Sequence, residues 1–132
     1  MRPAETVTGE QTMRVCIPTI SDTGLDGRLS PHSGKAPFFT LAEVEVGRVQ
    51  AVSNPNERHE EGRCDAVAAV RGRGVDVVVC RGMGLRALEA LRRHGLAVLV
   101  TDGWTVAAAL RELREGTLAP LSRELAGRHA HG

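Results

Sequence analysis

GVDVVVCRGMGLRALEALRRHGLAVLV, residues 74–100, is the stretch that decides the fold. Its run Val75–Cys80 is short, apolar and rich in β-branched residues, which is typical of a strand buried on both faces of a parallel sheet. A second run of the same character, Leu96–Val100, follows after a segment with helical spacing. The stretch therefore predicts a β-α-β unit, two adjacent parallel strands joined by a helix.

The connecting segment predicts an amphipathic helix over residues 84–94. Leucines recur there at helical spacing, and arginines take the other face. Gly95 is expected to cap the end of the helix, and His94 suits the last turn because a cation interacts favourably with the helix dipole. Ligands of open parallel sheets bind beyond the carboxyl ends of the strands. The residues expected at that edge are Cys80, Arg81, Gly82, Met83, Gly84, Thr101 and Asp102.

Composition indicates a single domain with a neutral surface. The 132 residues include 17 basic and 16 acidic side chains, with one Trp, two Phe and no Tyr. Such a chain is long enough for one core without disulfides. A net charge near zero and so few aromatic side chains speak against binding to nucleic acid or to an anionic membrane.

Targeting signals are also missing from the sequence. No segment approaches the roughly 18 apolar residues of a transmembrane helix, and the polar residues 1–12 do not resemble a signal peptide. We therefore expect a cytoplasmic protein. Its three cysteines are expected to be reduced thiols or ligands of a metal or cluster, not a disulfide framework.

The remaining elements complete an α/β architecture. The predicted strands are Arg14–Ile20, where Pro18 implies an edge position or a distortion, and a hairpin of Phe38–Val46 with Val49–Ser53. Further helices are predicted for Cys64–Arg73 and from an N-cap at Thr105 to Gly116. With the central unit, this order predicts a three-layer α/β/α sandwich around a five-stranded mixed sheet. The expected organisation is a disordered extension at 1–12, a domain at 13–118 and a flexible tail at 119–132.

The turn after the first central strand permits two interpretations. Gly82 to Ala87 fits G-x-G-x-x-A, and Asp102 lies twenty residues beyond Gly82, where dinucleotide-binding folds place an acid for the ribose. Against this, a hairpin precedes the unit and too little chain follows it for a second half. The alternative is that Gly82 and Gly84 form a tight turn and leave helix amides facing the sheet edge, a generic cradle for an anion or a cluster ligand.

Potential soft-metal ligands lie in two long loops. His32 is in the first, and His59 and Cys64 are in the second. Imidazole and thiolate together suit zinc, iron or an iron–sulfur cluster, but the absence of C-x-x-C speaks against a closed zinc site. Each histidine could equally be an exposed loop residue. Cys16 is expected in the core, and Cys80 either in the core or at the site.

Acid–base and nucleophilic catalysis find no support in the sequence. Ser33 does not lie in a nucleophile elbow, and the acids near His59 look like a solvated loop rather than a matched pair. The chain is therefore expected not to be an enzyme.

The motifs in order resemble those of a known family. They are RVCIP in the first strand, SPHSGKAPFF in the first loop, an Asn-Pro loop containing His59, GVDVVVCRGMG, the helix with its following GLAVLV strand, and TVAAAL followed by GTL. Together they cover residues 13–118. This pattern is similar to the dinitrogenase iron–molybdenum cofactor biosynthesis domain of NifX-like proteins, of NafY and of the C-terminus of NifB.

The resemblance implies a ribonuclease H-like motif without nuclease activity, because the strand-borne carboxylates of nucleases are missing. It implies non-enzymatic binding of an iron–sulfur or iron–molybdenum cofactor precursor in nitrogenase assembly, with donor and acceptor proteins as partners. The implied metal ligands are His32, His59 and Cys64, and the implied cofactor contacts add Gly34, Cys80, Gly82, Met83 and Gly84. A small-molecule or anion-binding regulatory domain without a cluster is the alternative.

Overall fold

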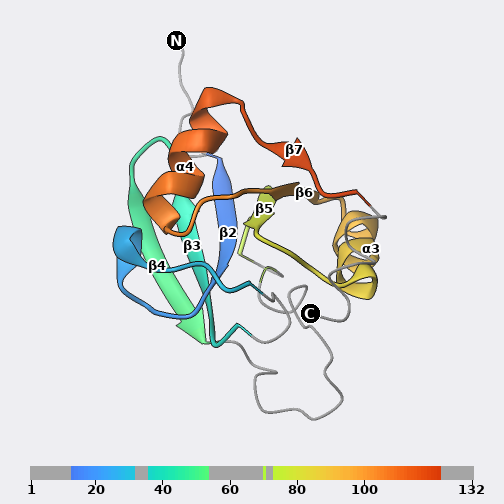
Figure 1. The fold of residues 1–132 in the computed structure, drawn as a ribbon, viewed down its shortest axis with the longest axis horizontal. Helices are drawn as coiled ribbons and strands as arrows, with labels where there is room; N and C mark the ends of the chain where they lie inside the picture. The colour runs from blue at the N-terminus through green and yellow to red at the C-terminus, as the bar shows by residue number, and fades with distance from the viewer. Residues whose placement is uncertain (1–12, 32–35, 54–69, 71–72, 123–132) are drawn as a thin grey trace.

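The computed structural model describes residues 13–31, 36–53, 70 and 73–122. These residues form one six-stranded mixed sheet, with an α-helix packed against each face (Figure 1). The spatial order of the strands is β4-β3-β2-β5-β6-β7. In chain order the elements are β2 (Arg14–Thr19), the 3-10 helix η1 (Gly24–Asp26), β3 (Phe38–Glu43), β4 (Arg48–Ser53), β5 (Val77–Cys80), α3 (Leu85–Arg93), β6 (Ala97–Val100), α4 (Val106–Glu115) and β7 (Ala119–Pro120).

The central β-α-β unit is confirmed. Strands β5 and β6 pair in parallel, with Val77 opposite Ala97 and Cys80 opposite Val100. All four residues of β5 are buried, as expected for a strand covered on both faces. Helix α3 connects the two strands, and both Leu88 and Leu91 are fully buried.

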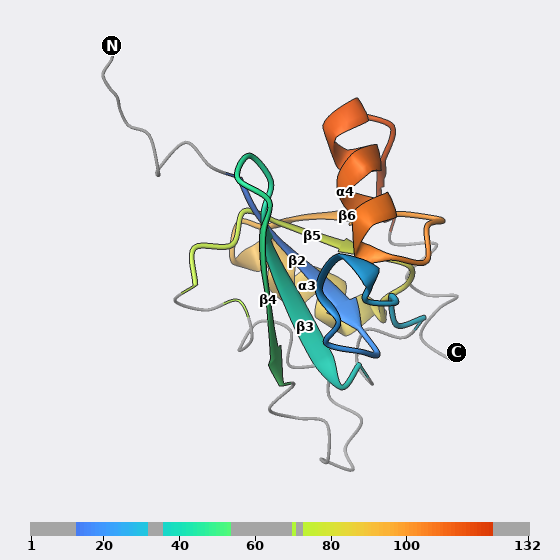
Figure 2. The ribbon, with the colours of Figure 1, turned by 90° about the vertical axis from the view of Figure 1, so that its left-hand side faces the viewer.

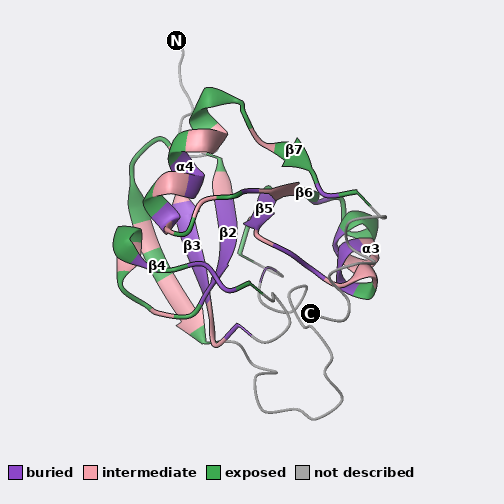
Figure 3. Cartoon of the chain, viewed as in Figure 1, coloured by how far each residue is buried: buried purple, intermediate pink, exposed green. Residues whose placement is uncertain are grey.

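Successive residues of the central strands alternate between two cores. Cys16 of β2 and Val78 of β5 pack in the cluster that contains the apolar face of α3. Their neighbours Val15 and Val77 pack on the opposite face, in the cluster that contains the apolar face of α4. Figure 2 shows the two helices on opposite sides of the sheet, and Figure 3 shows how burial concentrates in the central strands. Each face therefore has its own helix.

Helix α4 begins and ends where the sequence predicts. The Thr105 side chain caps its start by accepting a hydrogen bond from the Ala108 amide. Gly116 follows its last turn in the left-handed conformation, with φ of 74°. Glycine adopts this conformation without the steric cost that a Cβ atom imposes.

The hairpin of β3 and β4 is also confirmed, in full antiparallel register. Strand β3 ends at Glu43, earlier than the predicted Val46, because a tight turn intervenes. The amide of Gly47 donates to the Glu43 carbonyl at 2.8 Å and closes this turn. Val46, which the prediction placed in the strand, is therefore exposed at the turn.

Strand β2 lies inside the sheet, so Pro18 does not mark an edge. The parallel pairing of β2 with β5 covers only Val15 and Cys16. Beyond them, the chain that follows η1 returns along β2: Leu29 bridges Thr19, and the Ser30 amide donates to the Pro18 carbonyl at 3.0 Å. Proline is tolerated here because β5 no longer needs an amide donor from β2 at this position. The antiparallel register of β2 with β3 continues without interruption through Pro18 to Thr19.

The predicted five-stranded sheet and the predicted tail from residue 119 need correction. Ala119 and Pro120 form β7, which pairs antiparallel with β6 as a sixth strand. Leu121 is fully buried against the α3 side of the sheet, and its amide donates to the Val98 carbonyl at 2.9 Å. Burial of this leucine holds the chain against the sheet as far as Ser122.

Several predictions lie outside the described residues. They are the extension at 1–12, nearly all of the helix Cys64–Arg73, and the chain beyond Ser122. The ribonuclease H-like assignment stays a prediction. No helix in the described part of the chain is long and apolar enough to span a membrane.

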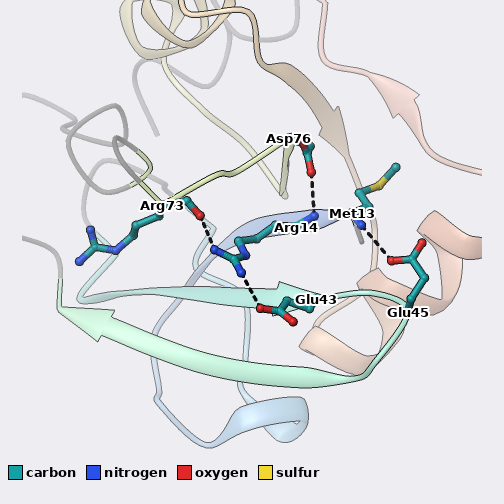
Figure 4. A network of polar contacts seen from close by, with 6 residues as sticks. All are labelled: Met13, Arg14, Glu43, Glu45, Arg73 and Asp76. Carbon is teal, nitrogen blue, oxygen red and sulfur yellow. Dashed lines mark hydrogen bonds and ion pairs between the residues drawn. The ribbon is translucent and has the colours of Figure 1, made fainter. Parts of the chain in front are cut away.

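A polar network fastens the amino ends of the central strands (Figure 4). The Arg14 guanidinium donates to the Arg73 carbonyl at 2.6 Å and pairs with the Glu43 carboxylate at 2.5 Å. The Arg14 amide donates to the carboxylate of Asp76, just before β5. This end of the sheet is thus tied together by groups whose charges compensate one another.

Candidate functional site

The carboxyl ends of β2 and β5 form a topological switch point. The two strands are parallel neighbours, but the chain continues from β2 to β3 on one side and from β5 to β6 on the other. In open α/β sheets, ligands bind in the crevice that such a reversal creates. The residues expected at this edge from the sequence follow β5 and β6 directly, so the structure places them at the same end of the sheet.

The turn between β5 and α3 buries two sulfur-containing side chains. Cys80 and Met83 are each 1% exposed and belong to the core on the α3 side of the sheet. Gly84 is the N-cap of α3 and provides no side-chain hydrogen bond to the first turn. The amides of a first helical turn have no partner within the helix, so this turn suits an anionic group.

Thr101 organises the end of β6. Its amide donates to the Cys80 carbonyl at 2.9 Å, which ties the two strand ends together. The buried Thr101 hydroxyl donates to the Glu112 carboxylate of α4 and accepts from the Gly103 amide. A Cβ atom on Gly103 would lie 3.0 Å from that of Ala108, a tight contact to which α4 would have to adjust.

Two arginines converge on the single tryptophan at this edge. The Arg81 guanidinium lies 3.5 Å from the centre of the Trp104 ring, and that of Arg28 lies 5.9 Å from it. Arg81 also donates to the carbonyls of Asp102 at 2.6 Å and Gly103 at 3.1 Å. We call Arg28, Arg81 and Trp104 the Trp104 cluster.

Four of the predicted site residues lie outside the described residues: His32, Gly34, His59 and Cys64. Of the predicted site, the described residues therefore include only the end of β5 and the turn after it, namely Cys80, Gly82, Met83 and Gly84. Within the described ranges, no three His, Cys, Asp or Glu side chains are arranged to hold a metal ion. The predicted metal ligands remain predictions.

The family described as dinitrogenase iron-molybdenum cofactor matches residues 13–116, which is most of the chain. The chain belongs to this family. The match begins one residue before β2 and ends at the cap of α4, so this cofactor family accounts for all the described elements except β7.

The chain is similar to one curated protein in sequence and to several solved structures in fold. The uncharacterized protein MJ0580 of Methanocaldococcus jannaschii is 23% identical over 111 residues, which cover 80% of this chain and 89% of that protein. A candidate NifB protein of Thermotoga, TM1290, has a solved structure with a TM-score of 0.70 and 28% identity, covering 83% of this chain and 93% of that one. The apo form of the orange protein of Desulfovibrio gigas has a TM-score of 0.74 at 22% identity, with the same coverage.

Sequence reasoning placed Arg81 at the edge but missed Arg28 and Trp104. Arg28 pairs with Thr105, and the Leu29 amide donates to the Trp104 carbonyl at 2.9 Å. These contacts join segments that are far apart in the chain, so no local pattern could reveal them. The available signal was that the one tryptophan of the chain follows the predicted edge residue Asp102 by two positions.

Proposed function

We propose that this protein binds and carries an iron–sulfur or iron–molybdenum cofactor precursor, without catalysing a reaction, as a component of cofactor assembly. The observation that carries the proposal is membership of the dinitrogenase iron-molybdenum cofactor family across residues 13–116. The switch-point edge supports it, because this is where an α/β sheet of this topology offers a binding crevice.

The chemistry of the edge suits such a cargo. Thiolate and imidazole are ligands for iron and its clusters, and His32, His59 and Cys64 would supply them from the two long loops. Among the described residues, the turn after β5 adds the uncapped first turn of α3, which favours negative charge. Metal–sulfur clusters held by thiolates carry net negative charge, so amides and soft ligands would act on the same cargo.

Cys80 and Met83 would contribute differently from the loop residues. Both are buried in the core, so they would form an apolar, polarisable floor beneath the cargo and would not reach out as first ligands. Carriage requires release as well as binding. A site whose ligands come from loops, above a floor fixed by the sheet, would allow both.

Anaerobic reconstitution with iron and sulfide tests the proposal. The wild-type protein should acquire a brown chromophore with bound iron, and His32→Ala combined with Cys64→Ala should abolish it. Binding should weaken steeply below about pH 6, because metal binding requires neutral imidazole. The measurements are visible absorption and iron analysis after gel filtration.

Matched controls separate ligand loss from damage to the fold. His94→Ala removes an exposed histidine whose ring bonds the Ala90 carbonyl of its own helix, and it lies outside the predicted site, so it should leave iron binding unchanged. Cys16→Ala removes a buried thiol of the core. It shows how far the loss of stability from a small cavity alone changes iron binding. A colourless wild-type protein that is stabilised by phosphate would instead favour an anion-binding domain. If His32→Ala combined with Cys64→Ala binds iron as the wild type does and keeps a native circular dichroism spectrum, the proposed ligands are wrong.

A further inference from the structure

We propose that the Trp104 cluster, with the exposed side chains of Ile20 and Leu25 beside it, is a docking surface for a protein partner that presents apolar side chains next to one or two carboxylates. The inference deepens the proposed function by naming the chemistry of the partner. It concerns the cargo-free protein, so it is tested without any cluster.

Three of the large exposed apolar side chains of the described residues belong to segments that main-chain hydrogen bonds join at this edge. The described residues include five exposed large hydrophobic side chains. Three of them, Ile20, Leu25 and Trp104, belong to this edge, and each is 46–47% exposed. The Ile20 amide donates to the Arg28 carbonyl at 2.8 Å, and the next residue after Arg28 bonds Trp104. Leu25 lies in η1, three residues before Arg28. Such a concentration of exposed apolar groups marks an interaction surface.

The surface is held in place by the fold. Arg28 bridges Thr105, and the Val106 amide donates to the Gly27 carbonyl at 2.9 Å, so the chain after η1 is fixed to the start of α4. The Arg81 guanidinium, which lies over the Trp104 ring, is also held by its hydrogen bonds to the main-chain carbonyls of Asp102 and Gly103. Groups that are ordered before binding lose little conformational entropy when a partner arrives. Tryptophan and arginine are also the residues that most often dominate binding energy at protein interfaces.

The charges of the cluster specify the partner. Neither Arg28 nor Arg81 forms an ion pair with a carboxylate of the described residues, although both approach the same indole ring. Two cations that pair with no carboxylate of the described residues, beside exposed apolar side chains, are complementary to carboxylates of a partner. Asp22, Asp26 and Asp102 are exposed on the neighbouring segments and would repel a strongly acidic partner. The partner surface is therefore mainly apolar, with few acids.

The position of the surface connects it with the proposed cargo site. Arg81 lies between Cys80, the last residue of β5, and Gly82, which begins the turn to α3. A partner seated on Trp104 would therefore stand at the edge where cargo would enter or leave. This is the position that a donor or an acceptor of cargo requires.

The experiment selects twelve-residue peptides from a random displayed library on the cargo-free, full-length protein. Enriched peptides should combine apolar residues with one or two acids. Labelled peptides should bind about tenfold more weakly to Arg28→Gln with Arg81→Gln, as measured by anisotropy, and wild-type binding should weaken as salt rises. Emission of Trp104 should shift on binding, and it reports this surface alone because the chain has one Trp and no Tyr.

The matched control is Arg93→Gln with Arg114→Gln, which removes the same charge from the exposed last turns of α3 and α4 and should not change binding. Peptides that lack acids, equal affinity for both double variants, or binding by DNA or anionic vesicles in place of peptides would overturn the inference. Reconstitution with iron should remain intact in Arg28→Gln alone, because Arg28 lies outside the predicted cargo site, so failure of the docking surface and failure of the carrier function are distinguishable.

Discussion

The two ends of the central strands both carry arginines, but they use them differently. At the amino end, the Arg14 guanidinium pairs with Glu43 and bonds the Arg73 carbonyl. At the carboxyl end, Arg28 and Arg81 approach Trp104 and pair with no described carboxylate. The Arg14 charge is thus paired with a carboxylate of the fold. The charges of Arg28 and Arg81 are paired with no carboxylate of the described residues.

This difference separates a structural end from the end that we propose to be functional. Partly buried charges that stabilise a fold are usually paired, because an unpaired charge loses hydration without compensation. Cations that remain uncompensated beside exposed apolar groups are available to a ligand or a partner. The carboxyl end is also the end at which open α/β sheets usually bind ligands, so strand topology and the unpaired arginines point to the same edge.

The largest effect is expected in the core that joins the two ends. Leu88 is fully buried in α3, so Leu88→Ala should lower the free energy of unfolding by about 2 to 5 kcal/mol. Trp104 emission reports the carboxyl end and far-UV circular dichroism the whole fold, and both should show the same transition in urea. A loss below about 1 kcal/mol would mean that the buried face of α3 is assigned wrongly. Separate transitions would mean that the ends do not share one core.

An intermediate effect is expected for Thr101, which fixes the carboxyl end from within. Thr101→Val should destabilise the protein by about 1 to 3 kcal/mol, because the Gly103 amide and the Glu112 carboxylate lose a partner in a part-buried position. Urea unfolding measures the change. The double variant with Glu112→Gln should lose less than the sum of the two single changes. Strict additivity would show that the two side chains do not interact in solution.

The smallest effect tests the comparison itself. Arg14→Met should cost about 1 kcal/mol more stability than Arg28→Met, because only the Arg14 guanidinium makes hydrogen bonds and an ion pair to described residues. Thermal or urea unfolding of the two variants side by side provides the difference. Equal losses would remove the distinction between a structural and a functional end.

Much of the fold could be predicted because its signals are local. The run Val77–Cys80 is apolar at every position, so it had to be covered on both faces, and Thr105 and Gly116 mark the ends of α4 by their own conformational preferences. Strand β7 could not be predicted in this way. Its two residues include a proline, and its place on the sheet depends on tertiary contacts: its pairing with β6, the burial of Leu121 and the hydrogen bonds that Leu121 makes with Val98 and Arg92.

The site was predictable to the extent that strand polarity determines it. The positions of Cys80, Gly82 and Thr101 at one edge follow from the parallel pairing of β5 and β6. The Trp104 cluster was not predictable, because it depends on the return of the chain after η1 to the start of α4. Whether His32 and Cys64 reach the same edge stays a prediction, since both lie outside the described residues.

Native mass spectrometry of the anaerobically reconstituted protein tests the carrier function most directly. A single chain should carry a discrete added mass equal to a whole number of iron and sulfide ions, and His32→Ala with Cys64→Ala should show the bare chain. Loss of the added mass on brief acidification to about pH 5 would agree with imidazole ligation. A wild-type spectrum that contains only the bare chain after reconstitution with iron and sulfide would contradict the account.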